Sequence, residues 1–187
     1  SKMMPEFEPV ILAHRNGHYI IRDWMGAVTE ISDRYDESYL RAAKDFVTRR
    51  WHRFPVENRS DWAQMRQRYD PQDPARFPSD LAVKGQLARE QGFVLSDVFN
   101  GVFWQLREWC GFENLCLLMA EDPDFVMEMA EFWGDFVLAL IRKLTALISP
   151  DRIIISEDMA YKAHSMISPA MTRQFILPQY RKWLPAL

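Results

Sequence analysis

Apolar residues recur at steps of three and four over residues 124–147, and this spacing predicts one long helix with a buried stripe. Asp122 can cap its first turn, and Pro123 suits the first helical position because the N–H there has no intrahelical partner. Charged residues interrupt the run, so it is too polar to cross a membrane. The stripe consists of Phe125, Met129, Phe132, Phe136, Leu140, Leu144 and Leu147.

The rest of the chain combines strand and helix patterns. Residues 18–31 alternate between polar and apolar and contain a glycine, which predicts a peripheral hairpin of two short strands. Two apolar runs, at 92–96 and 151–158, are predicted to be buried strands, and each precedes a helical pattern, an order that favours a parallel α/β sheet. The other helices are expected over 38–53, from a cap at Ser60 to Asp70-Pro71, over 79–90 and 102–120, and from Ser168-Pro169 onward.

Composition indicates a globular protein that folds as a single domain over residues 1–187. Within it we expect a peripheral hairpin (1–35), a helical segment (36–90) and βα units (91–187). The chain is 48% hydrophobic and 26% charged, with a net charge of −3. This balance argues against nucleic acid and membrane as partners, and the basic cluster Arg49, Arg50, His52 and Arg53 is interpreted as a solvated helix face. Cys110 and Cys116 are too few for a disulfide framework, which favours reduced thiols in the cytoplasm.

Acidic residues follow both predicted strands. Glu157 and Asp158 end one strand, and Ser96-Asp97 ends the other. Ligands of parallel α/β folds bind outside the carboxyl ends of the strands, so both sets are expected at one rim. Adjacent strand residues point to opposite faces, so at most one of Glu157 and Asp158 can point into a barrel. The alternative is that one carboxylate caps a neighbouring helix or pairs with Lys162.

Three stretches of the chain resemble the uroporphyrinogen decarboxylase family, a group of (β/α)8 barrels that also contains cobalamin-linked methyltransferases. They are "FPVENRSDWAQMRQRYDPQDPARFP", "GVFWQLREWCGFENLCLLMAEDPDF" and "SEDMAYKAHSMISPAMTRQFILPQYRKW". The likeness runs from about residue 18 to the end and implies a partial, helix-rich TIM barrel. Since a whole barrel needs about 250 residues, the chain is expected to be an internal portion of one.

The resemblance implies an enzyme, either a lyase that decarboxylates a tetrapyrrole-like substrate or a methyltransferase. Asp158 and Glu157 are the expected catalytic carboxylates, because a rim carboxylate can accept hydrogen bonds from pyrrole N–H groups. Lys162 would offset an acidic group, either the substrate's or Glu157's. The remaining residues expected near the substrate are Asp97, Phe103, Arg107, Tyr161 and His164, with Phe103 as an apolar wall and Tyr161 as a hydrogen-bond donor. The Arg-Gln-x-Gly-Arg motif of the decarboxylases is absent from this sequence.

No metal site is predicted. The histidines and cysteines are scattered, and His164 is interpreted as a loop hydrogen-bonder rather than a metal ligand. The resembled decarboxylases act without cofactor, whereas cobalamin or zinc would belong to a complete methyltransferase-type parent whose zinc ligands lie beyond Leu187. A partial barrel leaves strand edges uncovered, so we expect self-association. The alternative function is a non-catalytic piece that folds by pairing with another chain.

Overall fold

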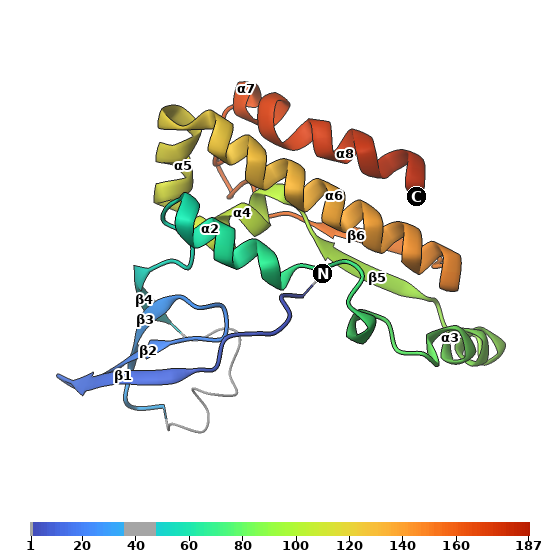
Figure 1. The fold of residues 1–187 in the computed structure, drawn as a ribbon, viewed down its shortest axis with the longest axis horizontal. Coiled ribbons are helices and arrows are strands. Elements are labelled where there is room, and N and C mark those ends of the chain that lie inside the picture. The colour runs from blue at the N-terminus through green and yellow to red at the C-terminus, as the bar shows by residue number, and fades with distance from the viewer. Residues whose placement is uncertain (1, 36–47) are drawn as a thin grey trace. The chain divides into compact units, whose positions relative to one another are not determined.

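The computed structural model describes residues 2–35 and 48–187, which form a mixed, helix-rich α/β fold (Figure 1). The chain divides into two compact units. The first contains residues 2–69 and 108–111, and the second contains residues 70–107 and 112–187. The strands in these ranges form an antiparallel sheet of four strands and a parallel pair, and no closed barrel is present among them. The expected α/β class is confirmed.

The first unit contains an antiparallel sheet in the order β1 (Val10–Arg15), β2 (His18–Arg22), β3 (Val28–Ser32) and β4 (Arg49–Arg53). The predicted hairpin is confirmed as β2 and β3. Asn16 and Gly17 join β1 to β2 with φ values of 53° and 73°, which Asn and Gly tolerate best.

The expected helix over 38–53 is wrong at its carboxyl end. Residues 49–53 form β4, which pairs with β3 in a register that sets Arg50 opposite Glu30. The basic cluster therefore lies on a strand, because sheet pairing overrides the local helical pattern. Residues 38–47 of that prediction lie outside the described residues.

The core of the first unit is rich in aromatic side chains. Helix α2 (Arg59–Met65) buries Trp62, which packs at 4.8 Å between ring centroids on Trp109, near the end of α4 (Val102–Cys110). Trp109 Nε1 donates to the Tyr69 hydroxyl at 3.1 Å. The expected cap at Ser60 is wrong, because Asn58 caps this helix by accepting from the N–H groups of Ser60 (2.9 Å) and Asp61 (3.0 Å). A short 3₁₀ turn (Arg66–Arg68) follows α2.

In the second unit the long predicted helix is confirmed as α6 (Pro123–Leu147), capped by Asp122. Most of the predicted stripe is buried, although Leu147 is exposed. A helical segment follows Ser168, whose side chain caps it, and comprises α7 (Pro169–Met171), a π turn (Thr172–Ile176) and α8 (Leu177–Trp183). In the described part of the chain, no helix is long and apolar enough to cross a membrane.

Helix α8 packs closely on α6 because α6 carries a glycine at the contact. Trp183 Nε1 donates to the Gly134 carbonyl oxygen at 2.7 Å. A Cβ atom at Gly134 would overlap the side chain of Gln179, which is buried. The absence of a side chain at position 134 is therefore what lets the two helices approach.

The parallel pair consists of β5 (Ser96–Asn100) and β6 (Arg152–Ser156), in a register that sets Asn100 beside Ser156. Helix α3 (Leu81–Glu90), which precedes β5, agrees with the prediction over 79–90. The strand predicted at 92–96 actually begins at Ser96. Both strands are half-exposed rather than buried, since Val98 and Ile154 face solvent. The single helix predicted over 102–120 is wrong, because Gly111, with φ of 77°, separates α4 from α5 (Phe112–Glu121).

Candidate functional site

The carboxyl ends of β5 and β6 form the rim at which the sequence places its candidate residues. Gly101 N–H donates to the Ser156 carbonyl oxygen at 2.7 Å, so the two strands are still joined where they end. Glu157 and Asp158 follow β6 at this rim. Asp97 does not share it, because it lies near the start of β5 in register with Ile153, and its Oδ1 accepts from the Val98 N–H at 2.8 Å. The expectation that both acidic sets meet at one rim is therefore wrong.

Glu157 caps the helix that begins beside it. Its Oε1 accepts from the Phe103 N–H at 3.1 Å and its Oε2 from the Trp104 N–H at 2.9 Å. These N–H groups belong to the first turn of α4, which has no intrahelical acceptors for them. The alternative that one carboxylate caps a neighbouring helix is confirmed for Glu157.

Tyr180, on α8, adds a third donor to the same carboxylate through its hydroxyl, which bonds to Oε1. Burial, together with the negative charge of Glu157, raises the pKa of the Tyr180 phenol, so it remains a donor at neutral pH. A Cβ atom at Gly101 would overlap the Glu157 carboxyl group, so this arrangement also requires glycine there. Glu157 thus ties together β6, α4 and α8.

Asp158 has a different environment. Its Oδ2 accepts from Arg107 Nη2 at 2.7 Å, and this ion pair is reached by solvent, since the Asp158 side chain is 42% exposed and that of Arg107 22%. The guanidinium lies 5.7 Å from the centre of the Trp104 ring. Phe103, expected to line the site as an apolar wall, is fully buried. Asp158 is therefore the rim carboxylate that a ligand can reach, held by a cation.

The residues after Asp158 form a small hairpin, Met159–Met166, which we term the rim hairpin. Ala160 and Ser165 form an antiparallel bridge, and Met166 N–H donates to the Met159 carbonyl oxygen at 2.7 Å. At its tip, Tyr161 N–H donates to the His164 carbonyl oxygen at 3.1 Å. Three expected substrate-contacting residues, Tyr161, Lys162 and His164, are thus brought together and are exposed.

Two amide side chains and a tyrosine at this rim were missed at the sequence level. Asn100, the last residue of β5, donates through Nδ2 to Gln105 Oε1 at 3.1 Å, and its carbonyl oxygen accepts from Trp133 Nε1 at 3.0 Å. The Asn-Gly pair that ends an apolar run is the local signal for this position. Tyr180 has no such signal, because it lies 23 residues beyond the carboxylate that it contacts.

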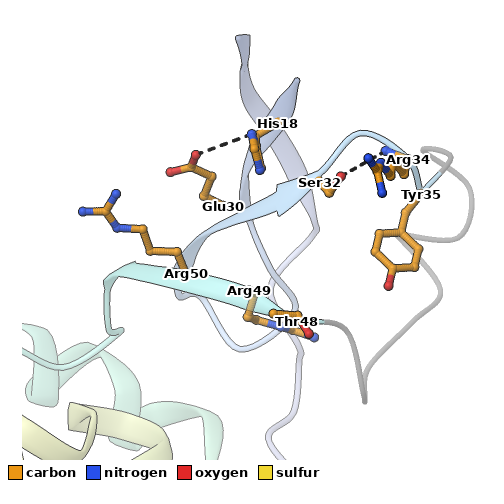
Figure 2. Close-up of a pocket in the computed structure, with 8 residues that line it drawn as sticks. All are labelled: His18, Glu30, Ser32, Arg34, Tyr35, Thr48, Arg49 and Arg50. Carbon is orange, nitrogen blue, oxygen red and sulfur yellow. Dashed lines mark hydrogen bonds and ion pairs between the residues drawn. The ribbon is translucent and has the colours of Figure 1, made fainter. Parts of the chain in front are cut away.

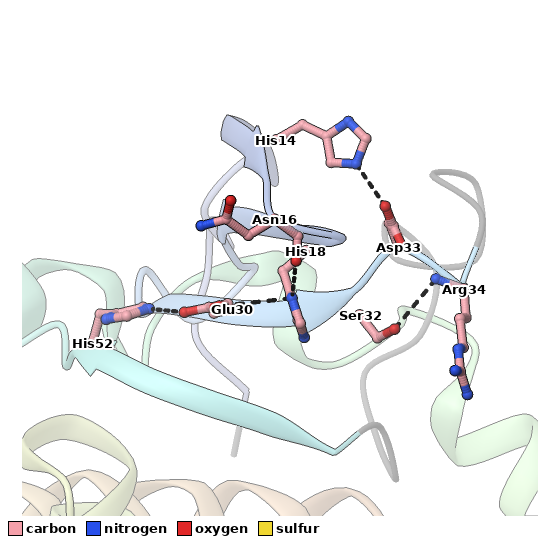
Figure 3. A network of polar contacts seen from close by, with 8 residues as sticks. All are labelled: His14, Asn16, His18, Glu30, Ser32, Asp33, Arg34 and His52. Atoms are coloured by element: carbon pink, nitrogen blue, oxygen red, sulfur yellow. Dashed lines mark hydrogen bonds and ion pairs between the residues drawn. The ribbon is translucent and has the colours of Figure 1, made fainter.

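A second polar cluster occurs in the first unit, on the four-stranded sheet (Figure 3). Glu30 Oε2 bonds to His52 Nε2 at 2.8 Å, and Glu30 Oε1 lies 4.0 Å from His18 Nδ1. The hydrogen bond from His52, with the charges of His52, His18 and Arg50, lowers the pKa of the Glu30 carboxyl. His14 forms a separate pair with Asp33 at 2.9 Å.

A cavity of about 680 Å³ adjoins this cluster (Figure 2). Arg49 contributes to its wall, and Nη1 of Arg49 pairs with Asp23 Oδ2 at 3.4 Å. Arg49 is thus already paired with a carboxylate, and the Glu30 carboxylate lies in the same wall. The cavity is therefore less suited to binding an anion than its arginines alone would suggest. The lining residues are His18, Glu30, Ser32, Arg34, Tyr35, Thr48, Arg49 and Arg50.

The cysteines and potential metal ligands do not form a site in the described ranges. Cys110 and Cys116 are free, and burial raises the pKa of the Cys110 thiol to about 12, so it is not a thiolate at neutral pH. Within residues 2–35 and 48–187, no cluster of three or more His, Cys, Asp or Glu side chains is arranged to hold a metal ion.

Comparison with known proteins yields no match: no family model fits the chain, and no curated protein or solved structure is significantly similar to it.

Proposed function

We propose that the chain is the ligand-facing part of a uroporphyrinogen decarboxylase-like barrel, which decarboxylates a tetrapyrrole-like substrate or takes part in cobalamin-linked methyl transfer. The observation that carries the proposal is the solvent-reached Asp158–Arg107 pair at the carboxyl ends of two parallel strands. This is the end at which parallel α/β folds bind their ligands. The sequence resemblance supplies the reaction class.

In this proposal Asp158 is the catalytic carboxylate and Glu157 is not. Both oxygens of Glu157 accept hydrogen bonds from the protein, whereas Asp158 is open to solvent. For a decarboxylase, Asp158 accepts hydrogen bonds from pyrrole N–H groups and stabilises the cation formed when the ring carbon is protonated. The electrons of the breaking carbon–carboxyl bond then neutralise the ring cation as carbon dioxide leaves, which makes the arm an exocyclic methylene group. A proton from water adds to this group and the ring carbon releases the proton it had gained, so the net change replaces the carboxyl group with hydrogen.

The test compares Asp158→Asn with Asp135→Asn. Both changes remove an Asp–cation pair reached by solvent, since Asp135 Oδ1 bonds to Lys182 Nζ at 2.9 Å on a helix surface. Chromatography would follow the loss of carboxyl groups from uroporphyrinogen, and absorbance would follow demethylation of methylcobalamin by a thiol. The resemblance implies that further strands complete the barrel, so the variants are compared in the whole protein that contains this segment. We expect one activity in the unchanged protein and in Asp135→Asn, and its loss in Asp158→Asn. Equal activity in the two variants would refute the role of Asp158.

A second candidate function, a non-catalytic piece that associates with another chain, is favoured by a separate observation. Val98 and Ile154 are paired in register on β5 and β6, and they are 50% and 37% exposed. Parallel sheets are normally covered on both faces. Absence of both activities, together with a stable dimer in sedimentation velocity, would favour this candidate.

A further inference from the structure

Helix α5 is apolar on more sides than are buried. It packs against α6 and buries Leu115 and Met119. Residues 115–120 are all apolar, and six residues span more than one turn of a helix, so packing on one side cannot bury them all. A helix that is apolar all round is normally covered on every side.

The apolar side chains that remain uncovered form one surface, which we term the outer α5 surface. Phe112 and Leu117 are 45% and 52% exposed, Ala120 is exposed and Cys116 is half-buried. Positions 112, 116 and 120 follow one another at steps of four, which makes them neighbours on the helix, and Leu117 lies beside this row. The surface is therefore continuous along the helix.

Negative charge alone surrounds this surface in the sequence. Between Arg107 and Arg142 there are eight acidic residues and no lysine, arginine or histidine. Glu113 and Glu121 lie near the two ends of α5, and Asp124 lies in the first turn of α6. These three carboxylates are exposed and form no ion pair with other residues in the described ranges. Unpaired charge of one sign attracts a partner of the opposite sign.

The charges decide which kind of partner fits. If two copies met through α5, Glu113 and Glu121 of one copy would face the same acidic residues of the other, whichever way the helices ran, and like charges would oppose the contact. Nucleic acids and anionic membranes would be repelled for the same reason. A helix with apolar residues along one side and lysines or arginines beside them satisfies both the apolar surface and the carboxylates.

We propose that the outer α5 surface is the docking site for a basic amphipathic helix of another protein. The apolar side of that helix packs on Phe112 and Leu117, and its cations pair with Glu113, Glu121 and Asp124. The small side chains of the row, at positions 116 and 120, leave room for the incoming helix between them. None of these residues belongs to the rim site, so the inference does not depend on the proposed reaction.

The probe for this site is a fluorescently labelled peptide of leucine and lysine that forms an amphipathic helix. Fluorescence anisotropy measures its binding to the whole protein that contains this segment. The peptide should bind at about 0.05 M salt and more weakly at about 0.5 M salt, because salt screens the charges. The same peptide with glutamate in place of lysine should not bind. Failure of the lysine peptide to bind, or equal binding of the two peptides, would overturn the proposal.

Matched variants locate the binding surface. Leu117→Gln should weaken binding about fivefold, whereas Leu87→Gln on α3, where the leucine is 51% exposed, should leave binding unchanged. Glu113→Gln combined with Glu121→Gln should weaken binding about fivefold at low salt, and Glu90→Gln on α3 should have little effect. All of these side chains are exposed, so the variants should keep their melting temperatures. Equal losses from the α3 and α5 variants would show that the peptide binds without a defined site and would overturn the proposal.

Discussion

Glu157 should be needed for folding more than for catalysis, and Glu157→Ala measures this. The change deprives two backbone N–H groups of α4 of their cap, a loss of about 1–2 kcal/mol. It also removes the acceptor of the Tyr180 hydroxyl, and a hydrogen bond to a charged group contributes about 1.5–3 kcal/mol. The free energy of unfolding should therefore fall by about 2.5–5 kcal/mol, a large part of the roughly 5–15 kcal/mol typical of a folded protein.

Urea denaturation, followed by tryptophan fluorescence, gives this difference. Tyr180→Phe is the matched control, because it removes one donor and leaves both backbone bonds, so its loss should be about 1.5–3 kcal/mol. Once Glu157 is replaced by alanine, Tyr180→Phe should cost little more, since the contact is already absent. A loss below about 1 kcal/mol in Glu157→Ala would show that water replaces the carboxylate and that our account of the cap is wrong.

Four further outcomes can be measured. Asp158→Asn should lower the free energy of unfolding by no more than about 1 kcal/mol in urea denaturation, because its ion pair is exposed to solvent; a loss near that of Glu157→Ala would make Asp158 a structural anchor. Gly134→Ala should lower the melting temperature by several degrees, because a Cβ there overlaps Gln179, and an unchanged melting temperature would refute this contact. Burial raises the pKa of the Asp23 carboxyl above its usual 3.8, so the stability that protonated Asp23 contributes is present below pH 3.8 and is lost as the pH rises through the folded-state pKa. In thermal melts from about pH 3 to 7, the stability of the unchanged chain relative to Asp23→Asn should therefore fall as the pH rises. A rise in that relative stability would show that the pKa of Asp23 is not raised. The exposed face of β5 and β6 should cause self-association at micromolar concentration, which a compact monomer in sedimentation velocity would refute.

Local chemistry predicted some elements well. The bounds of α6 followed from one apolar period, an aspartate cap and a proline at the first turn, all of which act within a few residues. The start at Ser168-Pro169 was predictable for the same reason. The start of β5 could not be predicted in this way. Residues 92–96 have the apolar pattern of a strand, but pairing with β6 begins only at Ser96. The strand β4 depends likewise on its pairing with β3.

The candidate site was predictable in part. The sequence placed two carboxylates at the end of β6 and recognised that one of them could be a cap. The sequence could not show which of the two carboxylates is the cap, because the donors to Glu157 lie on α4 and α8 and the partner of Asp158 lies 51 residues away along the chain. The prediction for Asp97 was wrong because it ended the strand at residue 96, which is where β5 begins.

The cap on α4 also has a consequence for synthesis of the chain on the ribosome. Glu157 lies 54 residues after Phe103 and 53 after Trp104, so the first turn of α4 leaves the exit tunnel 53–54 residues of synthesis ahead of its acceptor. At about 5–20 residues per second, this interval is roughly 3–10 s. During that time only water can satisfy the first N–H groups of the helix, and its final anchoring must wait until β6 has emerged and paired with β5.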